Sequence, residues 1–219
     1  MPVGVKDVIG QRVTRLGHST SRLLATASVL GRTFELDVLQ RLSRLNEDTL
    51  VDGLDSAVHA HVIEEVADAA GRYTFSHALI RDTLYSGLTA TRRALLHRRA
   101  GAALEEAHDA ELEPHLAQLA HHFAQAGSSV DLDIRRSATA RAGRYAISLA
   151  AYEQAAAHFR RTIELIDTTD AARQRQRCDL VIAQGEAERR RARLRWLASG
   201  LNSTQGPGDH RRSVSVAGR

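Results

Sequence analysis

Hydrophobic and polar residues alternate over residues 72–75 and then change to helical spacing over residues 78–85. The alternation predicts a strand with one apolar face, and the spacing that follows predicts an amphipathic helix. Ser76 stands at the change and is a favoured N-cap residue, so we expect it to cap this helix. His77 then falls in the first helical turn, where unpaired N–H groups and the helix dipole favour an anion. A phosphate group is therefore a candidate ligand of His77.

The same patterns predict a second strand and four helices before this junction. Residues 62–66, a polar turn and residues 72–75 together predict a β-hairpin. The helices are expected over residues 5–16, from Ser19 or Ser21 to Gly31, over residues 35–42, and from an N-cap at Asn46 to about residue 60, with Leu50, Val51, Leu54 and Val58 facing inward. Helices followed by a hairpin are the order of a winged helix.

Beyond this junction the hydrophobic spacing is helical to about residue 188. Two helices are expected over residues 91–107 and 112–125, and a polar link over residues 128–133 leads to the next pair. We predict a mainly α fold with one small β-hairpin: a winged-helix-like domain over residues 1–88, then a helical array over residues 89–188.

The last helical pair resembles a tetratricopeptide repeat. Gly143, Ala155 and Phe159 lie 12 and 4 residues apart, the spacing of that family's small and aromatic positions. We expect Phe159 to fill the gap between two helices that touch at the small residues. The family's final proline and one of its alanines are replaced, by Asp167 and Thr162. Gly185, which lies 42 residues after Gly143, marks a candidate second repeat.

Charge changes the interpretation of the C-terminal end. The chain of 219 residues has a formal charge of +4 and a pI near 9.8, which suggests a polyanionic partner. Residues 190–219 contain seven arginines and one acid, a net of +6, which leaves 23 basic and 25 acidic groups in residues 1–189. The basic character therefore belongs to the end of the chain, and residues 189–219 are expected to be a disordered basic tail.

Cysteine content and hydropathy favour a cytoplasmic protein. Cys178 is the sole cysteine, so an intrachain disulfide is impossible, and as a small residue on a repeat helix it is expected to be buried. The sequence has neither an apolar stretch that would span a bilayer nor an apolar N-terminal signal, so no membrane association is expected.

Three stretches together resemble STAND-type signalling ATPases, among them LuxR-type regulators and cyclase-associated ATPases. They are residues 8–34, residues 73–97 and residues 119–123 running into the repeat. In that family a histidine at the position of His77 contacts the β-phosphate of ADP. The resemblance implies that His77, with Ser76 and Arg81 beside it, senses bound nucleotide. For that role His77 must be exposed at the start of its helix.

The motifs of ATP hydrolysis are missing from the sequence. There is no G-x-x-x-x-G-K-[ST] loop, since the only lysine is Lys6. The resemblance therefore implies a non-catalytic regulatory or scaffolding module, not an enzyme, that binds ADP or ATP only together with an ATPase domain in a longer protein or a neighbouring chain. The helical array would bind protein partners. Alternatives are a stand-alone winged-helix DNA-binding transcriptional regulator and a non-functional gene fragment.

The sequence gives little support for DNA binding, a zinc site or nucleophilic catalysis. The helix after Asn46 carries four carboxylates and no lysine or arginine, so specific DNA binding is not expected. His115 and His121 lie six residues apart, which places them on different sides of a helix and disfavours a zinc site. Ser76 and His77 are adjacent in sequence, which does not give the geometry of an activated nucleophile, so no catalytic residue is assigned.

Overall fold

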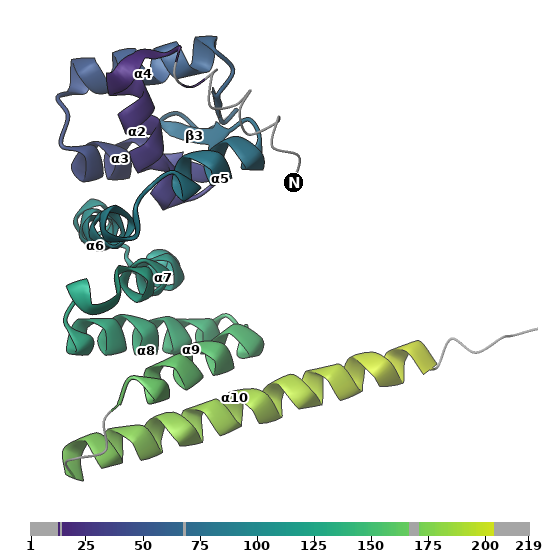
Figure 1. Cartoon of the computed structure of the whole chain (residues 1–219). Coiled ribbons are helices and arrows are strands. Elements are labelled where there is room, and N and C mark those ends of the chain that lie inside the picture. Colours follow the sequence, from purple (N-terminus) through teal and green to yellow (C-terminus); the bar gives the residue numbers. More distant parts are fainter. Residues whose placement is uncertain (1–12, 14, 68, 167–170, 204–219) are drawn as a thin grey trace, which may run out of the picture.

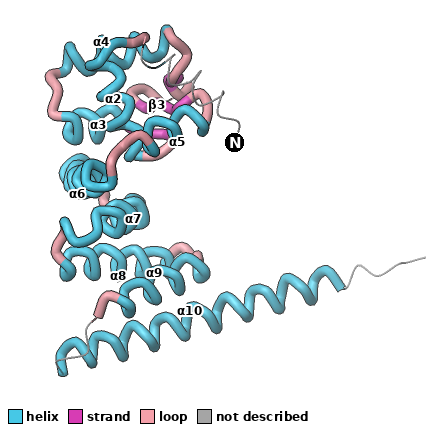
Figure 2. The backbone as a smooth tube through the Cα atoms, in the orientation of Figure 1, coloured by secondary structure: helices cyan, strands magenta, loops and turns pink. Residues whose placement is uncertain are grey.

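The computed structural model describes residue 13 and residues 15–67, 69–166 and 171–203, with side chains to residue 199. The fold is mainly helical with one small antiparallel sheet, as the sequence predicts (Figures 1 and 2). The elements in chain order are α2 (Gly17–Leu30), β1 (Thr33–Glu35), α3 (Leu36–Ser43), α4 (Glu47–His59), β2 (Ile63–Glu65), β3 (Arg72–Phe75), α5 (Ala78–Ser86), α6 (Ala90–Ala107), η1 (Glu113–His115), α7 (Leu116–Ala126), η2 (Gly127–Ser129), α8 (Leu132–Ser148), α9 (Tyr152–Glu164) and α10 (Ala171–Ser203).

The sheet contains one more strand than the sequence analysis predicted. The hairpin of β2 and β3 is confirmed, with Ile63 opposite Phe75. The additional strand, β1, pairs antiparallel with the other edge of β3 and places Phe34 opposite Tyr73. Strand β1 was not predicted because three residues directly before a helix are too few to show an alternation of apolar and polar positions. Its Phe34 ring lies 5.6 Å from the Phe75 ring, so β1 supplies part of the core.

Two of the predicted helix ends in this N-terminal unit are confirmed, the start of α4 and the end of α2. The Oδ1 atom of Asn46 accepts a hydrogen bond from the Thr49 N–H at 2.9 Å, which confirms the N-cap of α4. Helix α2 ends before Gly31 as predicted but starts at Gly17, ahead of both serines. Val51 is 39% exposed, so its inward placement was wrong; it lies beside the apolar stripe of α4 and not on it. The predicted helix over residues 5–16 lies mostly outside the described residues.

Two helix pairs lie below this unit (Figure 1), and each is held together by a contact between a glycine and a phenylalanine ring. A Cβ atom at Gly143 would lie 2.7 Å from Cε1 of Phe159, and one at Gly101 would lie 2.2 Å from Cε1 of Phe123. Phe159 is 2% exposed and Ala155 is fully buried, which confirms the predicted packing. The Gly101–Phe123 pair joins α6 to α7 and was not predicted. In both pairs a ring lies directly on the backbone of the facing helix.

The main hydrophobic core continues across residue 88, where the sequence analysis placed a domain boundary. It contains buried residues of every α-helix and β-strand from α2 to α8. The Arg99 guanidinium on α6 donates to the Leu42 carbonyl of α3 at 2.8 Å. A second, smaller core lies between α8, α9 and α10. The N-terminal unit and the first helix pair are therefore packed as one body.

Helix α10 contradicts two expectations about the C-terminal end. Residues 189–203 are helical, although disorder was predicted; residues 204–219 lie outside the described part. Arginine, alanine and leucine are good helix formers, and Arg190 pairs with Glu186 one turn earlier. Cys178 is exposed and not buried, because it lies on the side of α10 away from α9. Among the described helices none has the length and apolar character needed to cross a bilayer.

The two glycine–phenylalanine contacts predict a contrast between three alanine variants. Gly101→Ala and Gly143→Ala should each lower the free energy of unfolding by about 1–3 kcal/mol, because the added methyl group overlaps a ring. Gly185→Ala is the matched control, since nothing lies within 4 Å of its added Cβ. It should stabilise the protein by about 0.5–1 kcal/mol through helix propensity alone.

Denaturant titration at low protein concentration measures all three variants. Phe159→Ala serves as a reference, because removal of this buried ring should lower the free energy of unfolding by about 3–5 kcal/mol. Equal effects of the three glycine substitutions would show that the ring contacts do not constrain the helix pairs.

Candidate functional site at the strand–helix junction

Ser76 and His77 form the link between the end of β3 and the start of α5. The Oγ atom of Ser76 donates to the carbonyl oxygens of His61 and Val62, at 2.8 and 3.1 Å. Ser76 thus bonds the end of β3 to the residues before β2. It does not cap α5, so the predicted N-cap was wrong. The N-cap is His77, with an extended backbone at φ −134° and ψ 137° and no side-chain capping bond.

The His77 side chain is exposed, as a phosphate-sensing role requires. It lies one position before the first helical turn in which the sequence analysis placed it. The difference arises because Ser76 finds carbonyl acceptors across the hairpin, which leaves the next residue to begin the helix. The side chain of His77 is consequently available at the N-terminus of α5, on the edge of the N-terminal unit.

The Arg81 side chain bonds α5 to α2. Its Nε donates to the Ser28 carbonyl oxygen at 2.8 Å, and its Nη1 donates to Asp82 at 3.1 Å. Its guanidinium carbon lies 4.5 Å from the centre of the Tyr85 ring. The structure therefore gives Arg81 a structural role between helices, and His77 alone of the three predicted residues presents an exposed side chain.

A buried hydrogen-bonded chain leads from α5 into the helical array. The Tyr85 hydroxyl lies 2.9 Å from Nε2 of His97 on α6, and Nδ1 of His97 lies 2.9 Å from Nδ1 of His122 on α7. Both histidines are 1% exposed. The sequence analysis did not predict this association, since the two histidines lie 25 residues apart and meet only when the helices pack.

Burial keeps both imidazoles uncharged at neutral pH. It lowers the pKa of His97 to about 4, and His121, Arg81 and Arg93 add to the effect. It lowers the pKa of His122 to about 3, with smaller effects from His97 and His121. The short bond between the two Nδ1 atoms requires one proton between them, so protonating both rings would set two N–H groups against each other.

A second polar cluster lines a cavity of about 170 Å³ between β1 and helices α3, α6 and α7. Glu35 lies at its centre, with Oε1 accepting from Arg72 at 3.1 Å and Oε2 3.3 Å from Nε2 of His108. The His108 and His115 rings are stacked at 3.7 Å. Burial, followed by the nearby His108, lowers the pKa of His115. These contacts tie β1 and β3 to the segment that follows α6.

Neither cluster has the arrangement of a metal centre or of an activated nucleophile. Across residues 15–67, 69–166 and 171–203, no three histidine, cysteine or acidic side chains are placed to share a metal ion. The Ser76 hydroxyl donates to main-chain carbonyls and not to a general base. The arrangement can present an exposed imidazole to an anion and can transmit movement of α5 to α6 and α7.

Comparison of the chain with protein-family models, with curated proteins and with solved structures gives no match. The function proposed below therefore rests on the chain's own residues and contacts and on the resemblance described in the sequence analysis.

The neutral histidine pair predicts a loss of stability in mild acid. The unfolded chain takes up protons at these histidines below about pH 6.5, whereas the folded chain does not until about pH 4 and 3. Stability should therefore fall as the pH is lowered from 6.5 to 4, by up to about 1.4 kcal/mol per pH unit for each such histidine. Chemical denaturation at several pH values measures this slope.

The His122→Gln variant keeps a hydrogen-bonding side chain at this position but cannot take up a proton there. Its free energy of unfolding should therefore fall less steeply between pH 6.5 and 4 than that of the wild type. His18→Gln, at an exposed histidine, is the control and should keep the wild-type slope. Identical slopes for both variants would mean that the buried pair does not set the acid sensitivity.

Proposed function

We propose that this protein is a non-catalytic regulatory and scaffolding module of a STAND-type ATPase that takes part in signalling or in transcriptional regulation. Its N-terminal unit is a lid that responds to the nucleotide held by an ATPase domain, and its helical array is a surface for protein partners. The observation that carries the proposal is His77, whose exposed imidazole lies at the start of α5 directly after the hairpin.

The arrangement of the N-terminal unit supports this assignment. Helices α2, α3 and α4 precede the hairpin of β2 and β3, and β1 completes a three-stranded sheet, which is the order of a winged helix. An imidazole at a helix N-terminus is suited to an anionic phosphate because its N–H and the unpaired backbone N–H groups of the first turn can both donate to phosphate oxygens. His77 has this position.

The contacts of α5 provide a route from His77 to the rest of the molecule. Arg81 binds α2, and Tyr85 binds His97 of α6. Displacement of α5 by a nucleotide at its start would strain both contacts, and His97 is bonded in turn to α7. The nucleotide state at His77 would thereby alter the position of the helical array.

DNA recognition by the N-terminal unit is disfavoured by its charges. In a winged helix, α4 is the element that would enter the major groove. Glu47, Asp48, Asp52 and Asp55 are all exposed on it, and it has no lysine or arginine. These carboxylates would repel phosphate groups. Labelled duplex mixed with the protein at two salt concentrations should show no specific complex.

Nucleotide binding tests the proposed function in two steps. The chain alone should show no saturable binding of fluorescent ADP below about 1 mM, since one histidine and a helix terminus supply about 1–3 kcal/mol and a millimolar Kd requires about 4. Co-expression with a Walker-motif ATPase domain, from the same reading frame or a neighbouring gene, should give a complex that retains ADP. His77→Ala should then weaken ADP retention more than ATP binding.

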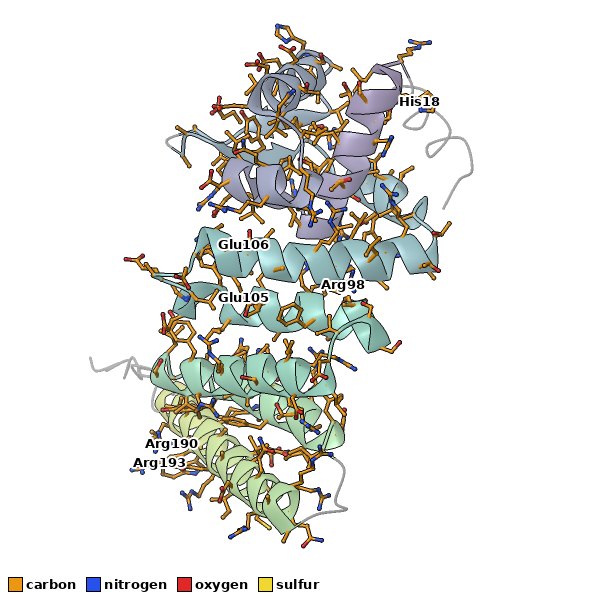
Figure 3. The ribbon with its side chains drawn as sticks, turned by 90° about the vertical axis from the view of Figure 1, so that its left-hand side faces the viewer. His18, Arg98, Glu105, Glu106, Arg190 and Arg193 are labelled. Atoms are coloured by element: carbon orange, nitrogen blue, oxygen red, sulfur yellow. The ribbon has the colours of Figure 1, made fainter. Side chains whose placement is uncertain are left out.

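His18→Ala is the matched control, because His18 is exposed at the start of α2, on the end of the molecule away from the helical array (Figure 3). It should leave the binding of both nucleotides unchanged. Equal losses of ADP and ATP in His77→Ala would reject the sensor role. Tight ADP binding by the chain alone, or no complex with an ATPase domain, would reject the proposed function itself.

A further inference from the structure

One side of α10 carries exposed apolar residues that no described element covers. Its inner side packs on α9, where Leu180 and Ala187 are buried. On the opposite side Ile182 is 69% exposed and Trp196 is 71% exposed. We call this side the outer face of α10. Its residues recur at alternating intervals of four and three: Cys178, Ile182, Gly185, Arg189, Ala192, Trp196 and Ser199. That spacing is typical of a helix that pairs with another helix.

Gly185 differs from two equivalent glycines because no ring lies on it within the described residues. Gly101, Gly143 and Gly185 follow one another at intervals of 42 residues. The first two are each covered by a phenylalanine ring from the next helix, whereas a Cβ at Gly185 would meet nothing within 4 Å. Within the described residues, the aromatic ring that the pattern requires at Gly185 is therefore absent.

We propose that the outer face of α10 binds the same face of a second copy of this chain, with the two α10 helices antiparallel. Trp196 lies 11 residues after Gly185, which is about three helical turns and hence the same side of the helix. Antiparallel pairing about a point between residues 190 and 191 sets each Trp196 on the partner's Gly185. Each copy thereby supplies the ring that the other copy lacks.

Side-chain size agrees with this register between residues 182 and 199. The same pairing sets Ala192 against the partner's Arg189 and Ser199 against the partner's Ile182, so a small residue meets a large one at each of these positions. A parallel pairing would set Trp196 against Trp196 and Arg189 against Arg189. Two tryptophans or two guanidinium groups in register would hold the helices apart, so the sequence favours the antiparallel arrangement.

Charge on the flanks of the outer face is complementary in the same register. Glu186 and Arg193 lie on one flank and Glu188 and Arg195 on the other, so antiparallel copies bring Glu186 near the partner's Arg193 and Glu188 near the partner's Arg195. Within one copy Glu186 also pairs with Arg190, and Glu188 lies 3.6 Å from Arg160 of α9, so each carboxylate would be shared between two arginines. Arg193 projects from α10 close to Arg190 (Figure 3).

The remaining arginines of this stretch point toward α9. Arg191 pairs with Glu153 of α9 at 3.0 Å, and Arg190 lies over the Tyr152 ring at 5.8 Å. Between residues 178 and 199 the outer face and its flanks therefore have Asp179, Glu186 and Glu188 against Arg189, Arg193 and Arg195. This even balance suits a second copy of the same face better than a strongly acidic partner.

Sedimentation equilibrium of the full chain tests the proposal. The wild type should be dimeric at about 100 μM, where an interface with a micromolar Kd is saturated. Trp196→Ala should weaken the dimer at least about tenfold, as loss of a central aromatic side chain does. Leu149→Ala, at a 60% exposed leucine outside α10, is the control and should remain dimeric. A monomeric wild type, or a dimer that tolerates Trp196→Ala, would overturn the proposal.

Exchange of charges tests the register. Glu186→Arg with Glu188→Arg in one chain, and Arg193→Glu with Arg195→Glu in another, should each prevent self-association through like charges. A 1:1 mixture of the two variants should form a heterodimer. A mixture that remains monomeric would contradict the register.

Disulfide cross-linking tests the direction of the helices. In a Cys178→Ser background, Ile182→Cys and Ser199→Cys chains should cross-link when mixed but not alone. Equivalent positions in an antiparallel pair would lie about 25 Å apart along the axis, beyond disulfide reach. Cross-linking of either variant alone would indicate a parallel pair and overturn the antiparallel model.

Discussion

The distance between paired helices is set by two glycines that have no room for a side chain. At Gly101 and Gly143 a phenylalanine ring occupies the space that a Cβ would need, so each helix pair approaches to backbone contact. Interiors that are packed this closely do not absorb an added methyl group without displacement of their neighbours. The positions of α7 against α6 and of α9 against α8 follow from these contacts, and the two pairs lie one below the other under the N-terminal unit (Figure 1).

Local signals in the sequence predicted those parts of the fold that depend on neighbouring residues. Asn46, Gly31 and the hairpin were recognisable because capping and strand alternation act within a few positions. The Phe159 contact was predicted from spacing that resembles a known repeat. The mainly α fold with a small hairpin followed from these signals together.

The rest depended on contacts that are distant in sequence. Strand β1 exists because β3 offers it a free edge, and its own three residues carry no pattern. Ser76 was expected to cap α5, but carbonyls 14 and 15 residues earlier compete for its hydroxyl. The bond between His97 and His122 needs two packed helices. Disorder was predicted for residues 189–203 from their charge, although their helix propensity and the Glu186 pairing favour the helix that forms.

Helix α10 is longer than the helix that supports it. It contains 33 residues, and its last ion pair to α9 is made by Arg191. The 12 residues that follow Arg191, up to Ser203, extend about 18 Å beyond that support. A tilt of about 10° at the α9 contact would therefore move the far end by about 3 Å, the distance of a hydrogen bond. The overhang would therefore enlarge, at the far end of α10, any small change of angle at its contact with α9.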